Sequence, residues 1–339
     1  MIQRLRYSAF PDRFAILPSD IYRFGPEQPD GRKFEIIERQ RLPNGIDVLA
    51  INAGLLAFDF AANSELGGLS SVRDADWPNG EIPQEAIQNR EMILAAQVER
   101  VRHATFVTAC ILGVHAHETH SSVTEAALPG LHEVYGFAVL PNGQFVVSSQ
   151  ETAALAKRLQ HRTGRRRHIP AEHVALGLSL AGRLIEARST FHVADPLTLM
   201  VMTYQGMLLH NRQHAGASIA LLGLVAESAL DEIIHAYGFV GGVTTRFPAP
   251  KGITHLTSGE VRKLGFNGRL KLITEAGLLS TYHASLTDEL RLARNALMHE
   301  AKDVAPYNSG PALNVVRELL RLCTGETGFE LNMSWSYRY

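Results

Sequence analysis

Residues 215–237 read AGASIALLGLVAESALDEIIHAY, and this stretch is the most apolar segment of the chain. It is too long for an ordinary strand, so it predicts a buried helix, which Gly238 brings to an end. Glu227 interrupts the apolar run, which therefore falls short of a membrane span. A carboxylate at this place either finds a partner inside the protein or lies at the rim of the helix packing.

Helical patterns continue on both sides of this segment, from residue 151 onward. Asp195 followed by Pro196 is a good N-cap with a first-turn proline, and Ser309-Gly310-Pro311 repeats the arrangement. Helices are predicted over residues 151–162, 171–189, 196–211, 215–237, 259–278, 285–301 and 311–323. Several amphipathic helices joined by short loops predict a mainly α protein whose C-terminal half is an antiparallel helical bundle.

Residues 1–150 carry a mixed pattern instead. Two pairs of short apolar runs each flank an Asn-Gly turn signal, which is typical of β-hairpins. The paired runs are residues 34–37 with 46–51 and residues 137–140 with 145–147. Between them, a helical pattern follows Pro83 and continues to Ile111. This part is therefore predicted to be an α+β module.

The patterns together predict three parts of the chain. These are an α+β module over residues 1–150, a helical bundle over 151–325 and a C-terminal tail over 326–339. Aromatic residues alternate in the tail as they do in a strand, and they are expected to dock on the protein's own surface or on a partner subunit. They are Trp335, Tyr337 and Tyr339.

Composition narrows the class of protein. The chain has 339 residues, 45% of them hydrophobic, and 33 Lys and Arg residues balance 34 Asp and Glu for a net charge of −1. That balance argues against wholesale coating of DNA, although a local basic groove stays open. Cys110 and Cys323 are the only cysteines and have no metal-ligand spacing, which favours a reducing cytoplasm. The N-terminus has no apolar stretch typical of a signal peptide, and we expect no membrane association.

One predicted helix carries a chemically versatile segment, Arg294-Asn295-Ala296-Leu297-Met298-His299. On a helical wheel, Asn295 and His299 share the face opposite an apolar stripe, and Arg294 lies on the flank between them. The stripe consists of Leu286, Leu290, Ala293 and Leu297. The wheel therefore predicts a guanidinium, an amide and an imidazole on the side away from the core. Spacing alone is weak evidence, because an Arg and a His five positions apart should occur by chance about once in this composition.

The segment resembles the signature of the HEPN superfamily of helical-bundle proteins, which is Arg, a polar residue, about three further residues and His. The preceding segment, 270–279, and the apolar helix 217–234, which Glu227 interrupts, are also similar to the family, so that the resemblance covers residues 170–325. It implies that Glu227 pairs with Arg294 and sets its orientation.

The resemblance implies metal-independent cleavage of RNA, with no cofactor. His299 would move a proton at the ribose 2′-OH or the leaving 5′-oxygen, and Arg294 would hold the phosphate while Asn295 assists. Active family members bring two signatures together across a dimer cleft, so one motif per chain implies a homodimer. Such nucleases commonly serve in phage defence or toxin systems, and residues 1–150 would then sense a signal or bind a protein partner.

A non-enzymatic interpretation stays open, because several HEPN proteins are regulators or scaffolds that keep the bundle and even the signature. In this interpretation Arg294, Asn295 and His299 would only hydrogen-bond a helix end or a dimer interface. Some family toxins also place a Tyr two residues after the His, whereas this chain has Ala301 there, which disfavours that subgroup.

A basic stretch offers a candidate contact for the RNA backbone. Residues 157–188 carry eight Lys and Arg against two Glu, and Gly164 and Pro170 indicate a loop at its centre. The arginines expected to contact phosphates are Arg162, Arg165, Arg166 and Arg167. The alternative is an exposed, solvated loop.

A third and weaker hypothesis is a metal site in the middle of the chain. His115, His117 and His120 form an H-x-H-x-x-H cluster, in which the first two point apart on a helix but together on a strand. The cluster lies near a predicted helix end, where the helix dipole favours histidine without any metal. We therefore expect no metal.

Overall fold

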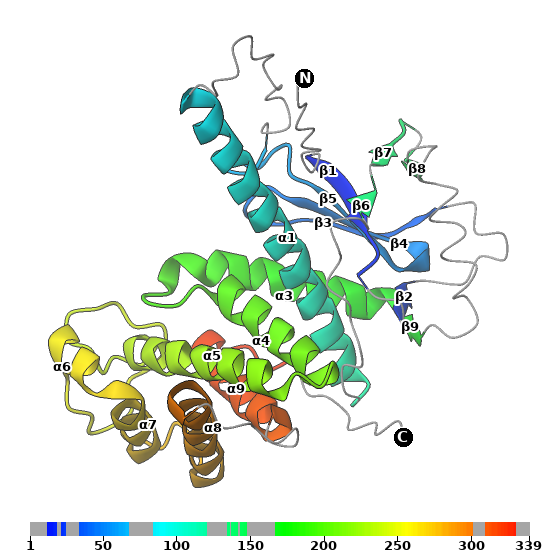
Figure 1. Ribbon diagram of the computed structural model, residues 1–339. Coiled ribbons are helices and arrows are strands. Elements are labelled where there is room, and N and C mark those ends of the chain that lie inside the picture. The colour runs from blue at the N-terminus through cyan, green and yellow to red at the C-terminus, as the bar shows by residue number, and fades with distance from the viewer. Residues whose placement is uncertain are drawn as a thin grey trace. The chain divides into compact units, whose positions relative to one another are not determined.

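The computed structural model (Figure 1) describes residues 12–18, 22–24, 34–67, 84–120, 134–135, 137–141, 143–147, 167–300 and 309–329. The chain forms two compact units, one of residues 1–108 and 126–178 and the other of residues 109–125 and 179–339. The protein is mainly helical, as predicted, with a small sheet region in its N-terminal part. The predicted boundary at residue 150 lies inside the first unit. In the described residues, no helix is long and apolar enough to cross a membrane.

The first unit is organised around a five-stranded antiparallel sheet with the order β3-β4-β5-β1-β6. Its strands are β1 (Arg13–Ile16), β3 (Ile36–Arg41), β4 (Asp47–Ile51), β5 (Leu55–Asp59) and β6 (Val134–Tyr135). The predicted first hairpin is confirmed as β3–β4. Gly45 makes its turn possible, because its φ of +82° lies in the left-handed region that favours glycine.

Successive side chains of a strand point to opposite faces of a sheet, and in this sheet both faces carry apolar side chains. One face packs in a core cluster with the hairpin of β7 (Phe137–Val139) and β8 (Phe145–Val147), the second predicted hairpin, which is also confirmed. On the other, Phe14, Phe58 and Phe60 stack with ring centroids 5.6–6.2 Å apart. Helix α1 (Gln84–Glu118), whose course the pattern after Pro83 predicted, sends the buried Arg100 over Phe60.

Two short strands complete the described part of the first unit. β2 (Tyr22–Phe24) pairs in parallel with β9 (Arg167–Ile169), and neither was predicted, because each has only three residues and no alternating pattern around it. α3 (Ala171–Ala187) follows β9 directly and matches the predicted helix 171–189.

Helices make up the second unit, and their bounds follow the sequence patterns closely. They are α4 (Pro196–Asn211), α5 (Ala215–Ala236), α6 (Ser258–Lys263), α7 (Gly265–Glu275), α8 (Thr281–Glu300) and α9 (Ser309–Thr324), with the short turn η4 (Arg188–Thr190) after α3. The predicted cap of α4 is confirmed, since the Asp195 carboxylate accepts a hydrogen bond from the Leu197 amide at 3.2 Å. The predicted helix 259–278 is wrong as one element, because Gly265 at φ +57° separates α6 from α7.

The apolar helix α5 is central to this unit and contacts α4, α7, α8 and α9 (Figure 1). Its contact with α4 is close because Gly206 of α4 has no side chain where Leu222 packs. The buried Ser218 hydroxyl donates a hydrogen bond to the Gly206 carbonyl at 2.8 Å, so it is not left unpaired inside the protein. An apolar helix buried among four others is the arrangement that residues 215–237 predicted.

The first residues of the predicted tail, 326–329, are in contact with the folded chain. Glu326 receives two hydrogen bonds from the Arg183 guanidinium of α3, at 2.8 and 2.9 Å, and Phe329 is buried. The aromatic residues of the tail, Trp335, Tyr337 and Tyr339, lie outside the described residues, as does the predicted helix 151–162.

Candidate functional site

Helix α8 carries the segment that resembles the HEPN signature. It is held by Leu290, which is 4% exposed, and by Thr287, which is fully buried and donates its hydroxyl hydrogen to the His283 carbonyl at 2.6 Å. The predicted stripe is only partly correct, because Leu286, Ala293 and Leu297 are half-buried. The buried line of α8 is therefore rotated from the predicted stripe towards Thr287 and Arg294.

Arg294 lies on the side of α8 that faces α5. The wheel had placed it on a flank, yet its stem packs on the backbone of α5 at Gly223. Its Nη1 donates to Glu227 Oε2 at 2.7 Å, so the pair implied by the resemblance is present. The side chains of Arg294 and Glu227 are 22% and 37% exposed, so the ion pair lies at the rim of the helix packing within reach of solvent.

Asn295 and His299 lie on another side of the same helix. Asn295 is half-buried, and His299 is exposed in the last turn of α8. Within the described part of the chain, no hydrogen bond joins Arg294, Asn295 and His299 to one another. Five helical residues correspond to a rotation of about 140°, so Arg294 and His299 leave α8 in different directions.

Two large apolar side chains are exposed on the same helix as His299. Met298 is 64% exposed and Leu292 is 53% exposed. Leu224 of the neighbouring helix α5 is also exposed, at 44%. The segment that follows α8, residues 301–308, and with it Ala301, lies outside the described residues.

The basic stretch is described only in part. Arg162, Arg165 and Arg166 lie outside the described residues, and Arg167 is exposed as the first residue of β9. Arg167 belongs to the first unit and Arg294 to the second, so the predicted path for an RNA backbone stays a prediction.

The histidine cluster belongs to the end of α1. His115 is buried and His117 half-buried in its last turn, where the dipole favours them, while His120 is exposed beyond the helix with a φ of +49°. Among the described residues, no group of three or more His, Cys, Asp or Glu side chains is arranged to hold a metal ion.

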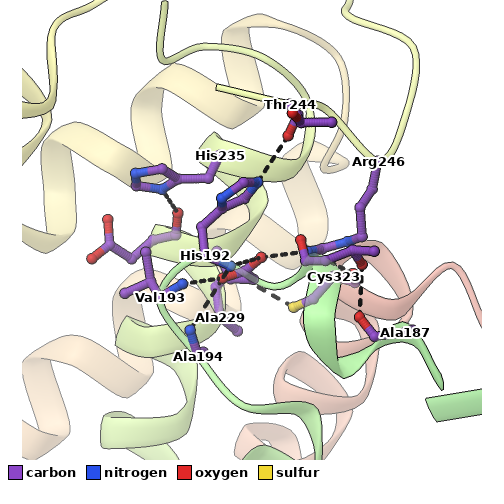
Figure 2. Close-up of polar contacts among 12 residues, drawn as sticks. Ala187, His192, Val193, Ala194, Ala229, His235, Thr244, Arg246 and Cys323 are labelled. Carbon is purple, nitrogen blue, oxygen red and sulfur yellow. Dashed lines mark hydrogen bonds and ion pairs between the residues drawn. The ribbon is translucent and has the colours of Figure 1, made fainter. Parts of the chain in front are cut away.

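A second charged centre of the unit was missed by sequence reasoning. Glu232 of α5 is 0% exposed, and its carboxylate accepts hydrogen bonds from three successive backbone amides of the segment between η4 and α4. These amides belong to His192, Val193 and Ala194, at 3.1, 2.7 and 3.1 Å (Figure 2). The sequence signal was a further acid in the most apolar helix, five residues after Glu227 and next to Asp231.

Arg246 completes this centre from the segment after α5 (Figure 2). Its guanidinium donates to Glu232 at 2.5 Å, to the Thr190 carbonyl at 2.8 Å and to the Cys323 carbonyl at 3.0 Å. It also lies 3.8 Å from the centre of the Phe191 ring, a cation–π contact. This centre joins α5, the segment before α4, the segment of Arg246 and the end of α9 to one another, and its hydrogen bonds are all within the protein.

Comparison with known proteins gives no relative. No family model matches the sequence, and neither a curated protein nor a solved structure is significantly similar to it.

Proposed function

We propose that this protein is a metal-independent endoribonuclease of the HEPN type. The observation that carries the proposal is the Arg294-Asn295-x-x-x-His299 segment on α8, with His299 exposed and Arg294 bound to Glu227 at the rim of α5. A permanently charged guanidinium and an imidazole, which can accept and return a proton, are the groups that phosphodiester transfer needs when no metal is used.

The proposed reaction is attack by the ribose 2′-oxygen on the adjacent phosphorus. His299 accepts the 2′-OH proton as the new bond to phosphorus forms, and a protonated imidazole returns a proton to the 5′-oxygen as its bond to phosphorus breaks. Arg294 stabilises the negative charge that builds on the phosphate oxygens, and Asn295 hydrogen-bonds the phosphate or His299. The products are a 2′,3′-cyclic phosphate and a 5′-hydroxyl end, and no cofactor takes part.

Two copies of the chain form the proposed site. Arg294 and His299 leave α8 in different directions, so a phosphate held by Arg294 of one protomer would meet His299 more readily from a partner. A homodimer would have about twice the protomer mass of 37.3 kDa. We further propose action in the cytoplasm, in phage defence or a toxin system, with Arg162, Arg165, Arg166 and Arg167 on the RNA backbone and a protein partner for the N-terminal module.

The second candidate function is a non-catalytic HEPN-like regulator or scaffold that binds a protein or nucleotide ligand. It is favoured by the ion pair itself, because Glu227 already neutralises Arg294. In this alternative the signature only holds α8 against α5, and its loss would change stability instead of cleavage.

The test incubates labelled RNA with the full chain in EDTA, as wild type, Arg294→Ala and His299→Ala. Arg291→Ala is a matched control, because Arg291 lies on the same helix with the same 22% side-chain exposure and pairs with Asp288 at 2.7 Å. We expect cleavage to survive chelation, to fall by about 100-fold or more in the first two variants, and to persist in the control.

Equal cleavage by all four proteins would show a contaminating nuclease and discard the proposal. Loss of cleavage in Arg291→Ala as well would place the effect in the stability of α8, and folded wild type without cleavage of any RNA would favour the scaffold. A 2′,3′-cyclic phosphate end, identified by mass spectrometry of the product, separates this reaction from metal-dependent hydrolysis.

A further inference from the structure

Two glycines of α5 face α8, and they differ in how much space a side chain would have there. Gly216 and Gly223 are seven residues apart, close to two helical turns, so they share one side of α5. Gly216 lies against Leu297 and Gly223 against Arg294, which means that the two helices run antiparallel along this contact.

The space at Gly223 is filled by the stem of Arg294. A Cβ atom built on Gly223 would lie 2.5 Å from Arg294 Cδ, 3.2 Å from its Cγ and 3.3 Å from its Cβ. Carbon atoms do not approach to 2.5 Å without displacement, since their optimal separation is about 3.5–4.0 Å. At Gly216 the nearest atom, Leu297 Cδ1, would lie at 3.5 Å, an ordinary contact. Any side chain at 223 therefore excludes the observed path of Arg294, whereas alanine at 216 does not disturb its neighbour.

The path matters because of where it ends. Glu227 lies one turn after Gly223 on the same side of α5, and its carboxylate receives Arg294 Nη1 at 2.7 Å. The aliphatic stem of Arg294 therefore packs on the backbone at Gly223, and its guanidinium is held by the Glu227 carboxylate. These two contacts restrict the conformations of the Arg294 side chain, which is 22% exposed, and hold its guanidinium at the rim of the helix packing.

We propose that Gly223 is a positioning residue of the Arg294–His299 site: it sets the path of the Arg294 stem, and through it the place at which the guanidinium meets a phosphate. The inference rests on the proposed function for its catalytic meaning, but the packing on which it depends can be tested separately. Gly223 touches no substrate and acts only through Arg294.

The experiment compares Gly223→Ala with Gly216→Ala in the full chain. Both variants replace a glycine by alanine in the same helix, Gly216 in its first turn and Gly223 in its interior, and alanine is favourable in helices, so neither should lower the melting temperature by more than about 3 °C. We expect Gly216→Ala to cleave RNA within about twofold of wild type and Gly223→Ala to lose about 10- to 100-fold, mainly in kcat, because a misplaced group acts poorly in the transition state. Equal cleavage by the two variants would overturn the proposal.

A second arm does not depend on cleavage. Each glycine variant is combined with Arg294→Ala, which removes Cγ and Cδ, and melting temperatures are compared in a double-mutant cycle. We expect Gly223→Ala to be more favourable by about 2 °C or more in the Arg294→Ala background than in wild type, and Gly216→Ala to be equal in both. Additive effects at 223 would overturn the positioning role. If the wild type cleaves no RNA, the proposed function fails, while this cycle still decides whether Gly223 positions Arg294.

Discussion

Glu227 and Glu232 of helix α5 each accept a hydrogen bond from an arginine, and the two pairs differ in burial, partners and surroundings. Glu227 is 37% exposed and binds only the Arg294 guanidinium in the described hydrogen bonds. Glu232 is 0% exposed and binds Arg246 together with three backbone amides. Five helical residues separate the two carboxylates by about 140° around the helix, so one faces the interior of the unit and the other its rim.

The difference shows which pair is built into the fold and which lies within reach of solvent. A buried carboxylate is tolerated only when its oxygens are satisfied, and Glu232 achieves this by fixing the loop before α4 and the end of α9. Solvent weakens the Glu227–Arg294 attraction, so this pair contributes only about 0–1 kcal/mol, and an incoming phosphate can compete for Arg294. Two glutamates of one helix therefore differ in role: Glu232 stabilises the fold, whereas Glu227 contributes little to stability.

The largest expected effect follows from removing the buried acid. Glu232→Ala leaves the Arg246 charge and three amides without their acceptor, and it should lower the free energy of unfolding by about 3–5 kcal/mol. Urea denaturation followed by far-UV circular dichroism measures this, with Glu227→Ala as the matched control on the same helix.

Glu232→Gln provides a milder version if the alanine variant is too unstable to purify. It keeps a carbonyl oxygen for the amides but loses the charge, so its cost should lie between those of Glu232→Ala and Glu227→Ala. A loss below about 1 kcal/mol for Glu232→Ala would show that the buried pair is not the stronger of the two.

The reactivity of the Cys323 thiol reports on the buried pair of Glu232 and Arg246, because Arg246 donates a hydrogen bond to the Cys323 carbonyl. Burial raises the pKa of the Cys323 and Cys110 thiols far above the ordinary value, so thiolate is scarce in the native protein. We expect neither thiol to react quickly with a disulfide reagent at pH 8. In Glu232→Ala, Cys323 should react at least about tenfold faster, because Arg246 no longer ties its carbonyl to the loop.

Cys110 serves as the internal control in that measurement, and peptide mass mapping distinguishes the two thiols. If both cysteines accelerate equally, the variant opens the unit as a whole and the local role of Glu232 is wrong. If Cys323 reacts in the wild type as fast as in urea, its burial itself is contradicted.

The regular elements could be predicted from the sequence because their signals are local. Asp195-Pro196 located the start of α4, and Asn44-Gly45 located the first hairpin, each through a backbone requirement of two adjacent residues. β5 was missed because its residues are buried without alternation. Arg246 could not be matched to Glu232, because the loop between them returns to α5 only through tertiary contacts, such as the Arg246 amide on the Ala236 carbonyl.

The positions of the candidate residues on α8 could be predicted only in part. The wheel predicted that His299 is exposed, and it is. It placed Arg294 on a flank from which the side chain could reach the outer face, whereas the guanidinium is directed to Glu227 of α5, because a helical wheel takes no account of the neighbouring helix. Gly223 on that helix opens a space for the Arg294 stem, and only the packed structure reveals it.

The smallest expected effect belongs to the rim pair. Glu227→Gln should change the free energy of unfolding by less than about 1 kcal/mol, because both partners are solvated and the amide still accepts a hydrogen bond. The difference from wild type should shrink further in 1 M salt, where the Debye length is about 3 Å. Urea denaturation at low and high salt measures both.

The same variant separates stability from the proposed activity. Glu227 orients Arg294 but also competes with phosphate for it, so Glu227→Gln should tighten RNA binding, measured as a lower KM, while kcat falls because the guanidinium is held less firmly. A loss of several kcal/mol in stability would mean that the pair is structural after all, and the distinction between the two carboxylates of α5 would then disappear.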